Sequence, residues 1–176
     1  MTITTEKLKE MVGVILHTAV SQLKNDGGLS QQFFILTHPD MDMEILSPVG
    51  EANDDALKSF VAQTVRERVK RGDVAAVIHV TDAWIAEPKD QAASDMIRRF
   101  QMGARVANAA GLANLREMVM VYAETPTSVY TLRQYYRRPD GPDTPRIELE
   151  GGLVEEPGMR YEGRFANLWP VSARPN

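Results

Sequence analysis

The amino-acid sequence predicts an α+β protein: a single mixed β-sheet of about six strands, with three amphipathic helices packed mainly on one face. Three observations indicate this class. Apolar residues recur at helical spacing in three segments, residues 74–85 form a nearly continuous apolar run, and short segments rich in β-branched and aromatic residues follow residue 116. No internal repeat or low-complexity linker interrupts the sequence. We therefore expect a single domain over residues 1–176, with its core at 5–168 and a frayed tail at 169–176.

The first half of the chain predicts a helix, a hairpin and a second helix. An apolar stripe runs through residues 5–25, and the glycines of "NDGG" end that helix, because glycine readily adopts the left-handed conformation that follows a helix. Strands at 31–38 and 43–47 flank the turn "PDMD". Asn53 is then a suitable N-cap for a helix whose basic last turn precedes Gly72.

The second half predicts a buried strand, a third helix and a run of strands. Residues 74–85 are apolar at nearly every position, which is typical of a central strand covered on both faces. Apolar residues at helical spacing predict a third helix at 89–110, which ends at Gly111. Gly103 lies inside this helix and lowers its stability, because an interior glycine is a poor helix former. Such a helix can act as a right-handed crossover that makes the strands before and after it parallel neighbours. We expect the later strands at 116–124, 128–138 and 146–151, and an edge strand at 164–169.

Composition and charge narrow the classes of function. The 176 residues are 43% hydrophobic and 25% charged with a mean hydropathy of -0.29, which is typical of a globular protein rather than a membrane protein. Cysteine is absent, which excludes disulfides, a thiol nucleophile and thiolate metal sites. The N-terminal residues lack the uninterrupted apolar segment of a signal peptide, so we expect a cytoplasmic protein. A net charge of -4 and a pI near 5.4 disfavour general binding to nucleic acid or anionic lipid.

Asp82 and Glu117 are the first candidates for chemistry. Asp82 lies at the end of the apolar run, and Glu117 lies near the start of the next predicted strand, beside Arg116. Parallel neighbouring strands would hold the two carboxylates apart, whereas antiparallel neighbours would bring them together. Two close carboxylates with raised pKa values can transfer protons or hold a divalent cation. The alternative is structural: Asp82 caps a loop or pairs with an arginine such as Arg116.

His79 is a candidate base three positions before Asp82. On a regular strand these two side chains lie on opposite faces, so an aspartate-oriented histidine would need a β-bulge. The alternative is a core histidine bonded to the backbone.

Metal and cofactor sites find little support in the sequence. The stretch "HPDMDMEI" alternates possible metal ligands, but the turn expected in its middle scatters them: His38, Asp40, Asp42 and Glu44. The glycines show neither the spacing of a P-loop nor that of a dinucleotide-binding loop. We therefore predict no metal and no cofactor.

A locally basic segment is compatible with binding to an anionic partner, despite the negative net charge of the chain. Residues 90–138 contain four acids and seven arginines, at positions 98, 99, 105, 116, 133, 137 and 138. Within it, "RQYYRR" interleaves arginines with aromatic residues, as proteins that bind single-stranded nucleic acid do. An edge strand protected by charge has the same pattern.

The segments "VIHVTDAW" and "LREMVMV" resemble a loosely defined family of small bacterial and phage-encoded hypothetical proteins. Members have a similar opening of helix, hairpin, helix and strand, a buried strand that ends in Glu-Ala-Trp, and an Arg-x-Glu-Ala or Arg-Glu-Ala segment running into another strand. The resemblance covers residues 31–124 and implies a fold and two marked positions, but no activity. Here Asp82 replaces the family's glutamate, and the helix expected at 89–110 replaces a polar loop.

The leading functional hypothesis is a non-catalytic binding module with a protein partner or a homo-oligomeric assembly, because the sequence holds no convincing nucleophile, metal cluster or cofactor loop. The first alternative is a carboxylate-based or metal-assisted hydrolase in which Asp82 and Glu117 act, supported by His79 and Arg116. The second is a nucleic-acid-associated regulator that uses the arginines between residues 98 and 138.

Overall fold

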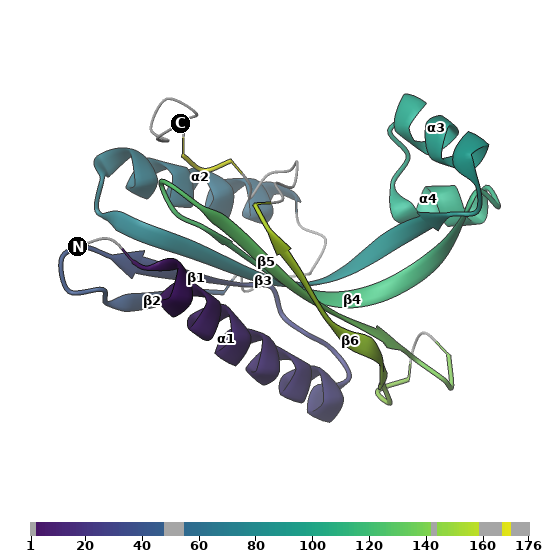
Figure 1. Cartoon of the computed structure of the whole chain (residues 1–176), viewed down its shortest axis with the longest axis horizontal. Coiled ribbons are helices and arrows are strands. Elements are labelled where there is room, and N and C mark those ends of the chain that lie inside the picture. The colour runs from purple at the N-terminus through teal and green to yellow at the C-terminus, as the bar shows by residue number, and fades with distance from the viewer. Residues whose placement is uncertain (1–2, 48–54, 142–143, 159–166, 170–176) are drawn as a thin grey trace.

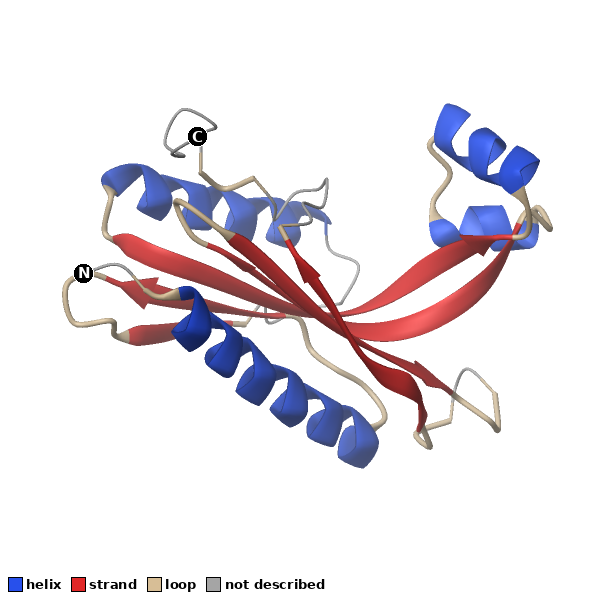
Figure 2. Ribbon diagram, viewed as in Figure 1, coloured by secondary structure: helices blue, strands red, loops and turns tan. Residues whose placement is uncertain are grey.

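The structure is a computed structural model, and it describes residues 3–47, 55–141, 144–158 and 167–169. Within these residues six strands form one sheet in the order β2-β1-β3-β4-β5-β6, accompanied by four helices (Figures 1 and 2). The predicted α+β class and the single six-stranded sheet are confirmed. No helix in the described part of the chain combines the length and the apolar character that a membrane crossing requires.

The elements follow the chain in an order close to the predicted one. Their bounds are α1 Thr5–Asp26, β1 Gln32–Thr37, β2 Met43–Leu46, α2 Asp55–Arg71, β3 Val74–Pro88, α3 Gln91–Arg99, α4 Ala104–Ala109, β4 Ala113–Glu124, β5 Val129–Arg137 and β6 Glu148–Pro157. The predicted N-cap Asn53, residues 164–166 of the predicted strand at 164–169 and the tail from residue 170 lie outside the described residues, and residues 167–169 are not a strand.

The prediction of a mixed sheet is wrong in its strand directions, because every described strand pair is antiparallel. β3 and β4 are the two sides of one long hairpin, paired from Val77 opposite Glu124 to Pro88 opposite Ala113. The helical segment between them closes the end of this hairpin, where the Lys89 amide donates to the Leu112 carbonyl at 3.0 Å. It therefore does not cross over the sheet.

The third predicted helix, at 89–110, is two helices in the structure. α3 ends in a turn where Gln101 has a left-handed φ of 48° and the Met102 amide donates to the Ile97 carbonyl at 3.0 Å. These are the features of a Schellman motif, which ends a helix by bonding its last carbonyls to the following amides. Gly103 then precedes α4, and the predicted end at Gly111 is confirmed by its left-handed φ of 73°.

The helices cover both faces of the sheet, and the prediction that they pack mainly on one face is wrong. α1 buries its apolar stripe against side chains such as Ile78 and Val121, whereas α2 packs with Phe33 and Val77 on the opposite face. Figure 1 shows α1 and α2 on either side of the strands. The reason lies in β3, whose first residues are apolar on both faces and need a cover on each.

The outer halves of β3 and β4 leave this core. β3 is buried from Val74 to Val80 and only half-buried over residues 81–87. In Figures 1 and 2 the hairpin extends beyond α1 and α2 and carries α3 and α4 at its end. We call residues 83–116 the arm and the remaining described residues the body. The predicted pair Asp82 and Glu117 lies where the arm leaves the body.

Candidate functional site

Asp82 and Glu117 lie close together on one face of the sheet. The antiparallel register places Trp84 opposite Glu117 and Asp82 opposite Val119, so the two carboxylates are diagonal neighbours. The Tyr136 hydroxyl on β5 links them: it donates to Asp82 Oδ1 at 2.6 Å and lies 3.4 Å from Glu117 Oε1. Of the two arrangements that the sequence left open, the antiparallel one brings them together.

Arg138 pairs with Glu117 at the edge of this cluster. Its Nε lies 3.2 Å from Glu117 Oε1, and the two side chains are only 9% and 11% exposed. The same guanidinium donates through Nη1 to the Gly27 carbonyl at 3.0 Å and to the Thr144 carbonyl at 2.7 Å. Arg138 thus ties the end of α1 and a loop to the sheet, and the Glu117 carboxylate is bound to it. The partner that the sequence suggested, Arg116, plays no part here.

Burial shifts the pKa values of Asp82 and Tyr136 towards their protonated forms. Burial raises the pKa of Asp82, while the hydrogen bond from Tyr136 and the charge of Arg138 partly oppose the shift. Burial and the neighbouring Asp82 raise the pKa of Tyr136 well above its usual range, so the phenol keeps its proton and remains a donor. Asp82 is half-buried and is the one predicted carboxylate not held by a cation, which makes it the group of this pair able to exchange a proton with a ligand.

His79 lies on the opposite face from Asp82, as strand alternation predicts. Its ring stacks on Phe33 with centroids 4.5 Å apart, and the Gln31 amide nitrogen lies 2.6 Å from its Nε2. Burial lowers the pKa of His79 to about 3, so the imidazole is neutral at physiological pH. The structure therefore does not bring His79 into the Asp82 cluster.

Arg116 also points to the face opposite Glu117. It donates to Glu87 at 2.6 Å, lies 3.4 Å from Glu150, and stands over the Tyr135 ring at 3.9 Å. Two of the four predicted site residues, Asp82 and Glu117, thus come together, and His79 and Arg116 do not join them. That these residues catalyse a reaction stays a prediction.

The alternating acids of "HPDMDMEI" are divided between a turn and β2, as expected. Glu44 lies in β2, where it forms an ion pair with Arg68 that lowers the pKa of Glu44. Across the described residues, no three histidine, aspartate or glutamate side chains gather closely enough to hold a metal ion.

The seven arginines of the basic segment divide into two groups. Four are paired with glutamates in the sheet: Arg116 with Glu87, Arg133 with Glu156, Arg137 with Glu148 and Arg138 with Glu117. The other three, which we call the arm arginines, lie on α3 and α4 and form no ion pair with any described residue: Arg98, Arg99 and Arg105. The arginines of "RQYYRR" are therefore paired with glutamates of the sheet. The arginines of the basic segment without an ion pair among the described residues lie on α3 and α4.

The arm also exposes apolar side chains. The stripe predicted to face the core buries only Ala93 and Ala107, while Met96 is 43% exposed and Phe100 60% exposed. Val106 of α4 adds a further side chain that is 58% exposed. The expected burial fails because α3 and α4 sit beyond the body, where no second layer covers them (Figure 1). We call Met96, Phe100, Val106 and the three arm arginines the arm surface.

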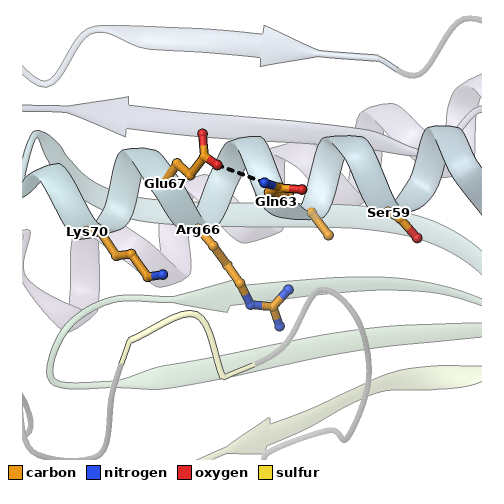
Figure 3. Close-up of a pocket in the computed structure, with 6 residues that line it drawn as sticks. Ser59, Gln63, Arg66, Glu67 and Lys70 are labelled. Atoms are coloured by element: carbon orange, nitrogen blue, oxygen red, sulfur yellow. Dashed lines mark hydrogen bonds between the residues drawn. The ribbon is translucent and has the colours of Figure 1, made fainter.

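Two depressions lie elsewhere on the body. One of about 340 Å³ is lined by a single helix, α2, and Figure 3 shows its polar side chains, with Gln63 bonded to Glu67. The other, of about 160 Å³, lies between α1 and β2 and includes Val14 and Met43. Neither contains a residue that the sequence singled out as catalytic.

One buried acidic residue, Glu124 at the end of β4, was not predicted as a functional or structural site from the sequence. It is fully buried and accepts hydrogen bonds from the Leu168 amide at 3.1 Å, the Trp169 amide at 3.4 Å and the Tyr122 hydroxyl at 3.2 Å. The signal was present in "VYAE", where Tyr122 and Glu124 share one face of a strand. Glu124 thus fixes a segment near the C-terminus to the face that α2 covers.

Comparisons with known proteins returned no match: no family model, no curated protein and no solved structure is similar to this chain. The resemblance drawn from "VIHVTDAW" and "LREMVMV" therefore stays a prediction.

Proposed function

We propose that this protein is a cytoplasmic binding module that recognises a protein partner through the arm surface. One observation carries the proposal. Phe100 is 60% exposed at the end of α3, which also carries Met96, Arg98 and Arg99, and the described residues provide no acidic partner for these two arginines or for Arg105 of α4.

The helices of the arm differ from α1 and α2 in how many of their apolar side chains are buried. α1 and α2 bury most of their apolar residues and expose single side chains such as Val14 and Phe60, whereas α3 is amphipathic but fully buries only Ala93. Burying a side chain such as Phe100 in an interface contributes about 1.5–3 kcal/mol relative to leaving it exposed. Aromatic and arginine side chains are also the types that dominate binding energy at protein interfaces.

Charge defines the kind of partner. Residues 89–110 contain four basic and two acidic residues, in a chain whose net charge is -4. The three arm arginines would attract an acidic surface and would orient it during the encounter, while the apolar side chains supply most of the affinity. The partner therefore has an apolar patch bordered by acids.

Photo-cross-linking in cells tests this proposal. A benzoyl-phenylalanine placed at position 100 is expected to give a discrete adduct, and the double change Arg98→Glu with Arg99→Glu is expected to abolish it. The matched control is the same probe at position 60, because Phe60 on α2 is 68% exposed but lies away from the arm. No adduct from position 100, or the same adducts from both positions, would overturn the proposal.

A second candidate function is a carboxylate-dependent enzyme that uses Asp82 for proton transfer. Its support is the 2.6 Å hydrogen bond from Tyr136 to a half-buried carboxylate whose pKa is raised by burial. The ion pair between Glu117 and Arg138 argues against a mechanism in which Asp82 and Glu117 act together. Screening of ester and phosphoester substrates tests this candidate: a hydrolytic activity lost in Asp82→Asn but kept in Phe100→Asp would support it, and no hydrolysis by the wild type would remove it.

A further inference from the structure

We propose that the arm bends relative to the body about its root, and that side chains from the end of β5 restrain this bending. The root consists of residues 81–84 of β3 and 117–120 of β4, which face each other in the hairpin. This inference does not depend on what the arm surface binds.

Strand pairing supports the body on both sides but supports the arm on one side only. Among the described residues, β1 pairs with β3 as far as Val80, and β5 pairs with β4 as far as Glu117. Beyond these positions, residues 83–88 and 113–116 pair with each other and with no third strand of the described chain. The arm is therefore a two-stranded ribbon that leaves a six-stranded sheet. Such ribbons twist more strongly than larger sheets and are marginally stable by themselves.

The hydrophobic core ends at the same level as the strand pairing. Val80 and Val119 still belong to the buried cluster under α1, but no residue of the arm belongs to a hydrophobic cluster of the described residues. Figures 1 and 2 show α3 and α4 at the far end of the hairpin, beyond the reach of α1 and α2. Segments with few buried apolar contacts change conformation at a low cost in free energy. The direction of the arm is therefore left to the contacts at its root.

Tyr136 restrains the root on one face of the sheet. β5 is not adjacent to β3, so the 2.6 Å hydrogen bond from the Tyr136 hydroxyl to Asp82 reaches across β4. Asp82 lies two residues beyond the last pairing with β1, at Val80. The same hydroxyl lies 3.4 Å from Glu117, which Arg138 holds. Tyr136 thus ties both strands of the root to β5.

Arg116 restrains the first residues of the arm on the other face. Its guanidinium carbon lies 3.9 Å from the centroid of the Tyr135 ring on β5, and its Nη2 lies 3.4 Å from Glu150 on β6. The side chains of Arg116 and Glu150 are 31% and 35% exposed, and ion pairs this exposed contribute little stability. The stretch "RQYYRR" thereby acquires a role, because its two tyrosines hold the root of the arm from opposite faces.

Pulsed electron paramagnetic resonance on the full chain measures the bending. The sequence contains no cysteine, so spin labels attach only where a cysteine is introduced. Ala92→Cys on α3 with Thr18→Cys on α1 reports the distance from arm to body, and Lys70→Cys on α2 with Thr18→Cys reports a distance within the body. All three positions are exposed. The arm–body distance distribution is expected to be broader than the distribution within the body.

Tyr136→Phe tests the restraint, because it removes the hydroxyl and keeps the buried ring. It is expected to widen the arm–body distribution roughly 1.5-fold and to leave the distribution within the body unchanged. Arg116→Gln is expected to widen the same distribution through the other face. The matched control is Tyr130→Phe, which alters a tyrosine of the same strand and the same hydrophobic cluster, at the end of β5 away from the root. It is expected to change neither distribution.

Three outcomes would overturn the inference. The first is an arm–body distribution as narrow as the one within the body, which would show a rigid arm. The second is a Tyr136→Phe protein whose arm–body distribution matches that of the wild type. The third is equal widening of both distributions, which would indicate a general loosening of the body. No partner is present in this experiment, so a rigid arm would leave the proposed function standing, and a failure of the cross-linking test would leave the hinge standing.

Discussion

The cluster around Asp82 and the arm surface are built from the same kinds of residue, yet they differ in what surrounds them. In the cluster, Arg138 reaches Glu117, Gly27 and Thr144 and lies beside an aromatic ring. Further out along the same hairpin, Arg99 lies near the Phe100 ring at 5.6 Å, with no ion pair among the described residues. The comparison teaches that burial and pairing, not residue type, separate a structural polar group from one available for binding.

The largest expected effect comes from removing Arg138, and Arg99→Met is the matched change in the arm. Arg138→Met is expected to lower the free energy of unfolding by about 3 kcal/mol, because it leaves the Glu117 carboxylate without its cation in a nearly buried site. Arg99→Met is expected to change it by less than about 0.5 kcal/mol, because Arg99 is exposed. Urea denaturation followed by circular dichroism measures both.

The double variant Glu117→Gln with Arg138→Met is the control for this prediction. It removes both charges, so it is expected to be more stable than Arg138→Met alone. Equal and small losses from Arg138→Met and Arg99→Met would mean that the two regions do not differ as described.

An acid-sensitive group in the body gives the next largest effect. Burial lowers the pKa of His79 from its ordinary value of 6.5 to about 3, so the neutral imidazole stabilises the fold above pH 6.5, and this stability is lost as pH falls from 6.5 towards 3. The loss amounts to roughly 3 kcal/mol by about pH 4. Unfolding measured between pH 7 and 4 checks it.

His79→Gln is expected to flatten this pH dependence, and His17→Gln, which changes an exposed histidine of α1, is expected to leave it as it is in the wild type. A wild-type profile that His79→Gln does not alter would contradict the assignment of acid sensitivity to the body.

The smallest expected effect tests how the arm helices are held. Arg105 of α4 stands over the Trp84 ring of β3, with its guanidinium carbon 4.9 Å from the ring centroid. Arg105→Ala is expected to cost about 0.5–1 kcal/mol of stability, as a partly exposed cation–π contact does. A double-mutant cycle with Trp84→Leu, followed by urea denaturation, measures the coupling; a coupling of zero would show that the Trp84 ring does not hold Arg105.

Local patterns in the sequence predicted most elements, and the errors concern how they come together. The apolar spacing at 89–110 is typical of a helix, but it does not indicate whether the next strand runs parallel or antiparallel to β3. A helical segment that closes a hairpin and a helix that crosses over the sheet therefore have the same sequence pattern. The apolar character of β3 on both faces did contain the information that helices cover both faces. Val77 and Ile78 lie on opposite faces of β3, and each face needs a cover, which is why α1 and α2 pack on opposite faces of the sheet.

The candidate site was predictable only within one strand. Alternation placed His79 opposite Asp82 and could have placed Arg116 opposite Glu117 in the same way. Arg138 was beyond reach, because its pairing with Glu117 depends on the register of β5 against β4. Tyr136 and Arg138 share a strand face in "RQYYRR", but which carboxylates face them follows only from the assembled sheet.

The stacking of Arg105 on Trp84 has a practical consequence. The chain has two tryptophans, and they report on different parts: Trp84 lies in the arm, and Trp169 is buried among the residues packed on α2. Replacing Trp169 by phenylalanine would leave a protein whose indole emission comes from the arm alone. The intrinsic tryptophan fluorescence of that variant would therefore report directly on the arm, where a partner is expected to bind.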